Sequence, residues 1–255
     1  MKNIRLLLLG LVHTASALAG TMNSSSDLGL HYSKDFYMGA NLSGDYSKYN
    51  IKLTDIRFAT GLVNRFGQTH LTDIAIAGGL FAGFAIHFPS PFYLGVEGFL
   101  HFSDNEAKAE IFDDNPINLE GLTFASFNVR NKRNAGLAIL PGIKINNTTL
   151  AYVRAGYVNG AFKVSGEGRA LLATGVVTTF NNEHDLNGFQ TGLGLNTSLS
   201  KNLSLRGEWV INIYQSFTDP VINRRGLTEG SLIFNHPTTS QFNLGIVYHF
   251  NDVPA

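Results

Sequence analysis

The feature that most constrains the fold is an alternation of apolar and other residues with a period of two. At the end of the chain, Phe242, Leu244, Ile246, Tyr248 and Phe250 alternate with residues that are mostly polar or small. Such a period is typical of a β-strand, because successive side chains point to opposite faces of a sheet. The segment 241–250 is therefore predicted to be a strand with one apolar face that ends in aromatic rings.

The same period recurs along the chain and predicts eight strands. In the segment 203–214, Leu205 and Trp209 fall on one face, and Arg206 and Glu208 fall on the other. The other alternating segments are 36–46, 74–88, 92–102, 135–145, 150–160 and 188–199. Each supplies the roughly 9 to 11 tilted residues with which a strand crosses a bilayer. Pro141 cannot donate a backbone hydrogen bond and predicts a bulge or bend within its strand.

The connections between the predicted strands alternate in length. Three of them, 89–91, 146–148 and 200–202, are tight turns, and four are long: 47–71, 104–133, 162–187 and 216–239. Short turns on one side and long loops on the other are typical of outer-membrane barrels, whereas long loops are uncommon in compact sheets. Lipid offers no partner to an open strand edge, so the first and last strands are predicted to pair.

These patterns predict an all-β fold for residues 36–250. We expect an eight-stranded antiparallel up-and-down transmembrane β-barrel with short periplasmic turns and four long extracellular loops. After residue 20, no apolar run is long enough for a transmembrane helix.

The beginning of the chain has the pattern of a secretory signal peptide. Lys2 and Arg5 precede the apolar run 6–12, and the small-residue site 17–19 follows. We expect cleavage after Ala19, which leaves a periplasmic lead at 20–35, the barrel at 36–250 and a C-terminal tail at 251–255.

Composition excludes several classes of function. Removing Lys2 and Arg5 from 19 basic residues leaves 17 against 19 acidic ones, so no basic surface for nucleic acid is expected. The absence of cysteine excludes a thiol nucleophile and a cysteine zinc site, and no phosphate-binding loop is present. We therefore predict no cofactor and no metal site.

Three segments carry a resemblance to a known family. They are 36–44 (FYMGANLSG), 95–98 (GVEG) and the aromatic-ended 245–250 (GIVYHF). The chain resembles the opacity-type and OmpA-like outer-membrane barrels over nearly all of its mature length. The resemblance implies a bacterial outer-membrane location with loops at the cell surface, in a superfamily that includes adhesins, variable antigens and small pores.

The alternation also predicts which side chains face the lumen. An eight-stranded barrel is about wide enough for side chains to fill it, so a diffusion porin is not expected. The charged residues at inward positions are Glu97, Lys144, Arg154, Arg206 and Glu208. Two interpretations stay open: these charges satisfy one another in a polar interior, or they form a gate that passes small ions.

The outward positions near the predicted strand ends carry aromatic rings, as the interface girdles of membrane barrels do. They are Tyr46, Phe92, Phe102, Trp209, Tyr248 and Phe250.

The long connections hold charged clusters that are candidates for binding. The basic residues are Arg130, Lys132, Arg133, Arg224 and Arg225, and the acidic ones are Asp104, Glu106, Asp113 and Asp114. One interpretation is solvation and contact with anionic lipopolysaccharide heads. The other is recognition of a host surface, matrix or glycan, because exposed loops on a rigid scaffold commonly bind ligands. With the resemblance, the second interpretation predicts a surface adhesin or antigen, and a structural barrel or narrow gated ion channel is the alternative.

An enzymatic function is a remote alternative. His101 and Ser103 have the His-x-Ser spacing of a lipid A deacylase family. A hydrolase needs that serine beside its base, with an acidic group that orients the base. Both residues share the lumen-facing parity, and no acyl cavity is evident, so we predict no enzyme. His87 and His249 are interpreted as polar lining of the periplasmic mouth.

Overall fold

The computed structural model describes residues 34–54, 56–58, 61–63, 67–88, 91–112, 122–170, 177–222 and 228–250. The predicted signal peptide, the C-terminal tail and all but the last two residues of the lead lie outside these ranges, as do Asp113, Asp114, Arg224 and Arg225. No helix in the described ranges is long and apolar enough to cross a membrane.

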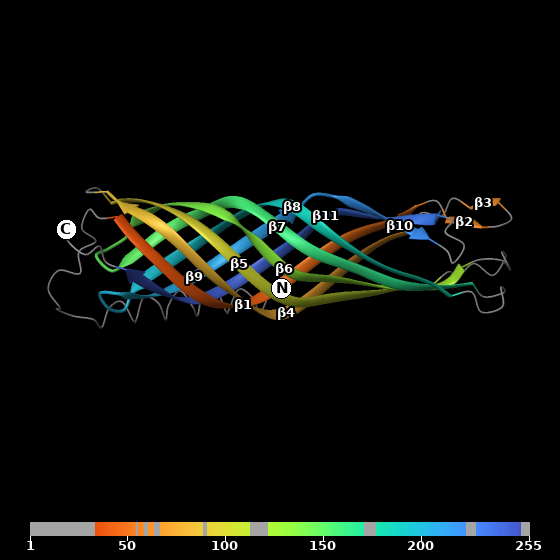
Figure 1. The fold of residues 1–255 in the computed structure, drawn as a ribbon, viewed down its shortest axis with the longest axis horizontal. Coiled ribbons are helices and arrows are strands. Elements are labelled where there is room, and N and C mark those ends of the chain that lie inside the picture. The colour runs from red at the N-terminus through yellow and green to blue at the C-terminus, as the bar shows by residue number, and fades with distance from the viewer. Residues whose placement is uncertain are drawn as a thin grey trace.

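Eight long strands form one closed antiparallel barrel (Figure 1). They are β1 Lys34–Thr54, β4 Gly67–His87, β5 Phe92–Phe112, β6 Leu122–Lys144, β7 Thr149–Ala170, β8 Val177–Ser198, β9 Leu203–Tyr214 and β11 Thr228–Phe250. Neighbours in sequence pair along the sheet, and β1 pairs with β11 from Phe36↔Phe250 onward, which closes the barrel. The predicted eight-stranded barrel and the pairing of its first and last strands are confirmed.

Three short strands complete the fold. Strand β10 (Phe217–Ile222) follows β9 after two residues and pairs with β11. Strands β2 (Ile56–Phe58) and β3 (Gly61–Val63) form a small hairpin of their own.

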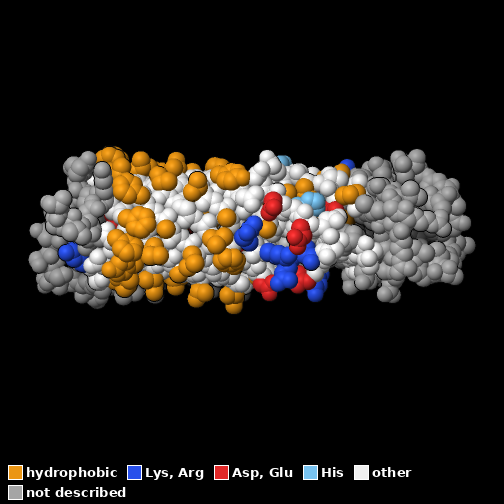
Figure 2. Space-filling model, in the orientation of Figure 1, with side chains coloured by type: hydrophobic (Ala, Val, Ile, Leu, Met, Phe, Trp, Pro, Cys, Tyr) orange, Lys and Arg blue, Asp and Glu red, His pale blue; other side chains and the backbone are white. Residues whose placement is uncertain are grey.

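The outer face of the barrel carries a broad apolar band near the short turns (Figure 2). Residues such as Leu42, Ile76 and Leu137 are largely exposed there. The six predicted girdle aromatics are exposed as well, from Trp209 and Phe250 at 41% to Phe92 at 59%. Apolar side chains on the outside of a closed barrel are what a lipid environment requires.

The strands continue far beyond this band, and this corrects the predicted loop boundaries. The segments 47–71, 104–133, 162–187 and 216–239 were expected to be loops, but most of their residues belong to β1, β4, β5, β6, β7, β8, β10 and β11. Part of each of these four segments lies outside the described ranges.

Beyond the band, the barrel divides into two sheets. Pairing between β4 and β5 ends at Ala77↔Ser103, and pairing between β8 and β9 ends at Gly188↔Tyr214. The other ladders go on, so β4-β1-β11-β10 form one four-stranded sheet and β5-β6-β7-β8 form the other. We call this part the projecting sandwich. In Figure 1 it is the narrower part of the molecule, where β10 and β11 lie above the continuation of β6 and β7.

The projecting sandwich has an apolar interior. Phe217 stacks on Phe234 with ring centroids 4.4 Å apart, and Phe162 meets Tyr214 edge-on at 4.9 Å. The cluster of buried side chains comprises Tyr49, Ile51, Leu71, Ala107, Phe127, Val129, Val158, Phe162, Val164, Leu186, Tyr214, Leu232 and Phe234. Apolar residues therefore face outward in the band and inward in the sandwich.

A register shift in β6 lies near the end of the apolar band, and none lies at Pro141. The β6–β7 ladder shifts between Asn131 and Arg133, so that Lys132 and Arg133 are both exposed. At Pro141 the ladder to β7 omits Leu140 and Pro141 but resumes in the same register. Of the bulge or bend predicted at Pro141, the bulge is wrong, because the missing donor interrupts the pairing with β7 without adding a residue.

The substitution Phe234→Ala should loosen the projecting sandwich and leave the barrel intact. Phe234 is fully buried against Phe217, and truncation of such a ring costs about 3–5 kcal/mol. Limited proteolysis in detergent should show faster cleavage between 45 and 76, while the barrel still resists SDS until heated. The control Leu193→Ala removes an outward side chain of the band that is 57% exposed, and it should leave cleavage unchanged. Equal cleavage of both variants would contradict a packed sandwich.

Candidate functional site

The centre of the barrel holds a buried ionic network around Glu97 of β5. Glu97 is fully buried, and its carboxylate pairs with two arginines from other strands. Arg154 of β7 donates from Nη2 to Oε1, and Arg206 of β9 donates from Nη1 to Oε2 at 2.5 Å. The Tyr37 hydroxyl adds a hydrogen bond of 3.0 Å to Oε2. One carboxylate thus joins four strands across the lumen.

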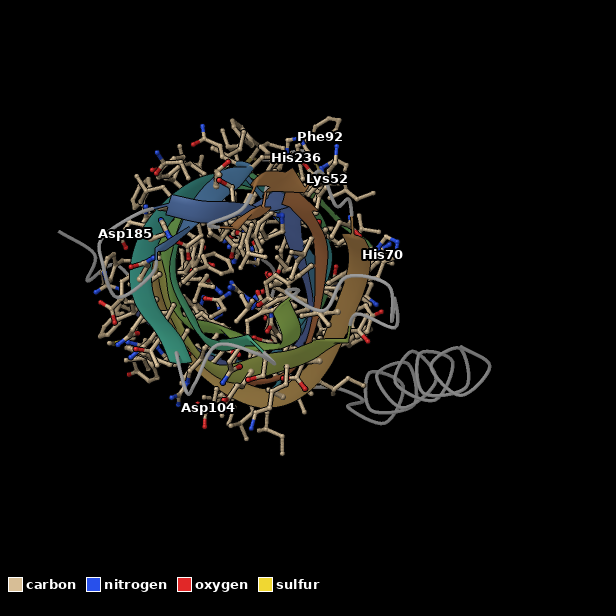
Figure 3. The ribbon with its side chains drawn as sticks, turned by 90° about the vertical axis from the view of Figure 1, so that its right-hand side faces the viewer. Lys52, His70, Phe92, Asp104, Asp185 and His236 are labelled. Atoms are coloured by element: carbon tan, nitrogen blue, oxygen red, sulfur yellow. The ribbon has the colours of Figure 1, made fainter. Side chains whose placement is uncertain are left out.

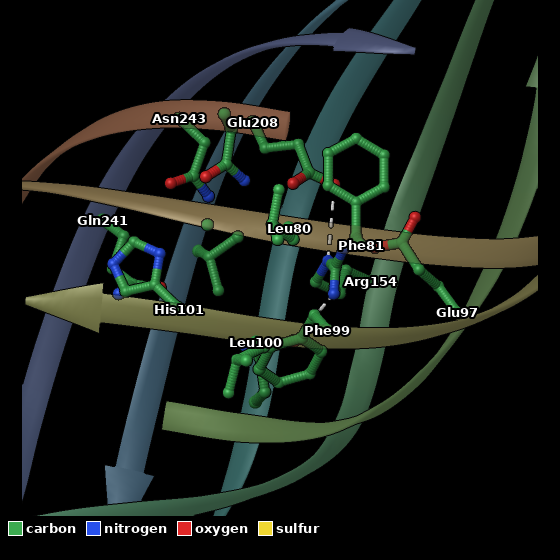
Figure 4. Close-up of a pocket in the computed structure, with 14 residues that line it drawn as sticks. Leu80, Phe81, Glu97, Phe99, Leu100, His101, Arg154, Glu208, Gln241 and Asn243 are labelled. Atoms are coloured by element: carbon green, nitrogen blue, oxygen red, sulfur yellow. Dashed lines mark hydrogen bonds and ion pairs between the residues drawn. The ribbon is translucent and has the colours of Figure 1, made fainter. Parts of the chain in front are cut away.

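Arg154 extends the network to Glu208. Its Nε lies 3.3 Å from Oε1 of Glu208, and its Nη1 donates to Gln190 Oε1 at 3.0 Å (Figure 4). The Tyr152 hydroxyl donates to the same Glu208 oxygen at 2.5 Å. The network therefore contains two carboxylates and two guanidinium groups, and its formal charge is zero.

Aromatic rings cover the two guanidinium groups. Arg206 lies over Phe81 at 4.4 Å from the ring centroid and over Tyr37 at 5.2 Å, and Arg154 lies over Phe99 at 5.4 Å. Cations gain attraction from the faces of aromatic rings, most of all where water is excluded. Both arginines are buried, with Arg154 4% and Arg206 2% exposed.

Of the five charged residues predicted to face the lumen, the structure joins four: Glu97, Arg154, Arg206 and Glu208. Lys144 is only half-buried and lies opposite Leu150 in the β6–β7 ladder. Leu150 and Arg154 are four residues apart on β7, which corresponds to a distance of about 13 Å along the strand at its usual rise per residue. Lys144 therefore lies nearer the short-turn end than the network.

A chain of polar side chains continues from the network toward the sandwich. Gln190 donates to Asn212 at 2.9 Å, Asn212 donates to Gln241 at 3.3 Å, and Gln241 donates to Asp45 at 3.2 Å. A cavity of about 20 Å³ lies between Arg154 and Gln241 (Figure 4), which is room for about one water molecule. Four of these polar residues were not predicted from the sequence, because nothing but their inward position marks them: Asp45, Gln190, Asn212 and Gln241.

His101 and Ser103 do not form the pair that a hydrolase requires. Both are buried in the lumen, but His101 Nε2 lies 3.0 Å from Asp45 Oδ2 and 3.4 Å from Ser43 Oγ. Ser103 Oγ has no hydrogen-bond partner among the described residues.

A second polar chain lies at the short-turn end, where β1, β9 and β11 meet. Asp35 Oδ2 lies 2.5 Å from His249 Nδ1, and His249 Nε2 lies 2.9 Å from Ser204 Oγ. His87 approaches the same Asp35 oxygen at 3.9 Å. Closure of the barrel brings these distant residues together. No group of three or more side chains suited to a metal ion occurs in the described part of the chain.

On the face seen in Figure 2, a cluster of acidic and basic side chains lies beyond the apolar band. Arg130 pairs with Asp104, and Lys132 Nζ donates to Glu183 at 2.7 Å. The hydrogen bond from Lys132 holds the pKa of Glu183 below its usual value. Arg133 is exposed opposite Phe102 in the ladder.

Removal of the Glu97 charge should strongly destabilise the barrel. Glu97→Gln leaves the Arg206 guanidinium buried without its carboxylate, and breaking a buried ion pair costs about 3–5 kcal/mol. Urea unfolding in lipid vesicles, followed by the fluorescence of Trp209, the single tryptophan, measures the loss. Glu183→Gln, which breaks a solvent-exposed pair, is the control and should unfold like the unmodified protein. A Glu97→Gln barrel as stable as the control would show that the network contributes nothing.

Comparison with known proteins agrees with this architecture. Residues 5–250 match the family model described as "Outer membrane protein beta-barrel domain". No curated protein sequence matches the chain.

Solved structures of small outer-membrane barrels are similar over most of the chain. Ail of Yersinia pestis is 12% identical, with 83% of this chain and 99% of that chain covered and a TM-score of 0.35. Neisserial surface protein A is 10% identical, with 84% and 97% covered and a TM-score of 0.40. The outer membrane protease OmpT from Escherichia coli is 8% identical, with 85% and 97% covered and a TM-score of 0.48.

Because the family model spans nearly the whole chain, this protein belongs to the outer-membrane protein β-barrel domain family.

Proposed function

We propose that this protein is an adhesin or surface antigen that binds its ligand through the projecting sandwich and the connections at its tip. The protein is located in the bacterial outer membrane, with its long connections at the cell surface. The observation that carries the proposal is the contrast between a filled bore and a large, ordered structure beyond the apolar band.

A filled bore disfavours the alternative of an ion channel. The Glu97 network crosses the lumen between four strands, and the apolar core of the sandwich lies beyond it. An ion on this path would have to leave water between buried aromatic side chains, at a large cost in free energy. A channel gate would have to open the Glu97 network and the apolar core of the sandwich at the same time.

The ordered sandwich supports a binding role. Loops on a rigid scaffold commonly bind ligands, and a packed scaffold lowers the entropy that is lost on binding. Two consecutive cations, Lys132 and Arg133, are exposed where the apolar band ends. We propose that these two residues contact the anionic heads of lipopolysaccharide and hold the sandwich at a fixed height.

Removal of the sandwich should abolish ligand binding. Bacteria that display the intact protein are compared with bacteria that display a shortened variant. In this variant, short turns join residue 46 to 72, 103 to 134, 160 to 188 and 214 to 237. Binding to host cells and to purified matrix proteins should be lost at equal surface display. The variant Leu193→Ala, which truncates only an outward side chain of the apolar band and keeps the sandwich, is the matched control for display. Unchanged binding after the removal would favour a structural barrel.

A hydrolase is disfavoured even though one hydrogen-bonded chain has a familiar order. Asp35, His249 and Ser204 follow the carboxylate–imidazole–hydroxyl order of serine hydrolases. Such enzymes also need free donors for an oxyanion. Ser204 is 2% exposed and is paired on both sides, with Ser198 and Val247, so that strand pairing occupies the local backbone.

A fluorophosphonate probe should therefore not label the folded protein. The reagent reacts with a serine that a base activates and beside which free donors stabilise the developing oxyanion. Strand pairing on both sides of Ser204 occupies the local backbone donors. Labelling is measured by mass spectrometry on protein in detergent, with Ser204→Ala and Ser198→Ala as matched variants. Labelling that Ser204→Ala alone removes would overturn the non-enzymatic assignment.

A further inference from the structure

The division of the barrel into two sheets leaves two seams in the projecting sandwich. One seam separates β4 (67–76) from β5 (104–112), and the other separates β8 (177–187) from β10 (217–222). No backbone pairing joins the strands across either seam in the described ranges. An unpaired strand edge is a template for a further strand.

The polar groups at the β4–β5 seam have partners of their own. Asp73 Oδ2 accepts a hydrogen bond of 2.7 Å from the backbone N–H of Glu106, which bridges the seam. Asp104 pairs with Arg130, and Glu106 accepts a hydrogen bond from Asn128. This seam therefore offers little to a new ligand.

At the root of the β8–β10 seam the backbone N–H of Gln215 donates to the Asn187 carbonyl at 2.9 Å. Beyond that bond, the contacts across the seam are between side chains. Asn182 Nδ2 donates to Asp219 Oδ1 at 2.5 Å, and the His184 ring lies 4.7 Å from the Phe217 ring. Asp219 is 1% exposed, and among the described residues its other oxygen, Oδ2, has no hydrogen-bond partner; His184 Nε2 lies 3.6 Å from it. A buried carboxylate oxygen without a partner is costly and is an unusual feature in a native interior.

The outer rim of the same seam carries a second carboxylate. Asp185 is exposed on β8, and among the described residues it makes no ion pair. Figure 3, a view down the barrel axis, shows Asp185 at the outer edge of the wall. The seam thus has one carboxylate outside and one inside, and no lysine or arginine in the described part of the chain forms an ion pair with either of them.

We propose that the β8–β10 seam docks an extended basic peptide segment of a partner protein, which adds a strand to the edge of β8. This inference rests on the proposed binding function and names its class of partner. Backbone pairing to an exposed edge gives affinity, and side chains at alternate positions give specificity. Strand β10 is the poorer template, because Pro220 lacks a backbone N–H.

The two faces of the added strand meet different surroundings. Outward lysine or arginine side chains lie beside Asp185, and inward apolar side chains meet Phe217 and Leu186 of the sandwich core. Backbone N–H groups of the segment supply donors for Asp219. The Asn182–Asp219 contact must open as the segment enters, because an inserted strand needs about 4.8 Å on each side.

The test uses the full chain in detergent micelles and three labelled octapeptides. The first alternates arginine and valine, the second replaces arginine with glutamate, and the third is the first with alternate backbone nitrogens methylated. Fluorescence anisotropy should show binding of the first peptide and at least tenfold weaker binding of the other two. Equal binding of the methylated peptide would overturn strand addition, since it cannot form the full ladder.

Two variants locate the site. Asp185→Asn should weaken binding of the arginine–valine peptide at least fivefold, whereas the matched Asp104→Asn, which removes a carboxylate at the other seam, should leave it unchanged. The chain has no cysteine, so Asn182→Cys with Asp219→Cys can be bridged by a short reversible thiol crosslinker. Bridging should abolish binding, and reduction should restore it to the level of the double variant before bridging, which is weaker than that of the unmodified protein because the Asp219 carboxylate is absent. If neither Asp185→Asn nor the bridge changes the affinity for the arginine–valine peptide, the proposal is overturned.

The failure of this inference is distinguishable from the failure of the adhesin proposal. If removal of the sandwich abolishes cell binding but the bridged seam still supports it, the seam is not the docking site and the adhesin function stands. If the peptide binds at the seam but cell binding survives removal of the sandwich, the adhesin function fails.

Discussion

The structure depends on the requirement that backbone polar groups in lipid be paired within the protein. Eight strands meet this requirement when β1 pairs with β11, from Phe36↔Phe250 to Thr54↔Ser231. That closure also determines the interior, because it brings Asp35 to His249 and Asp45 to Gln241. Beyond the apolar band, water can satisfy open edges, and there the wall divides into two sheets.

The change of solvent along the strands explains the change of core. Within the band, lipid contacts the apolar outer face, so polar side chains occupy the lumen and must satisfy one another. Glu97, Arg154, Arg206 and Glu208 do so with no formal net charge. In the sandwich, water contacts the outer face, and the ordinary hydrophobic effect brings Phe162, Phe234 and their neighbours inside. The same strands therefore enclose a polar interior within the band and an apolar interior in the sandwich.

Much of the barrel was predictable from the sequence, because the odd or even position of a residue along its strand determines the face on which its side chain lies. Alternation alone placed Arg206 and Glu208 inward and Trp209 outward, as the structure has them. The sandwich was mistaken for loops because its apolar residues change parity. On β7 the exposed apolar residues are the odd-numbered Val153 and Tyr157, whereas the buried ones beyond the band are the even-numbered Phe162 and Val164. A strand prediction that follows apolar residues on one face of the strand therefore ends where the medium outside the barrel changes from lipid to water.

Other features depend on pairing between distant strands, which parity does not specify. Asp35 and Ser204 meet His249 only in the closed register. The seams arise where two ladders stop, and no sequence motif marks the last pair. Lys144 has the expected parity but lies at another level from Arg154, since alternation predicts the face and not the height of a contact.

The central claim, that packed strands with an apolar interior continue beyond the membrane, is tested most directly on β7. Single cysteines are introduced into this cysteine-free chain, and intact cells are treated with a membrane-impermeant maleimide. Lys163→Cys and Ser165→Cys should react quickly, Phe162→Cys and Val164→Cys slowly, and Val153→Cys and Tyr157→Cys not at all within the lipid. Equal reaction at all four positions from 162 to 165 would contradict the account, because it would show a solvated loop in place of a strand with a buried face.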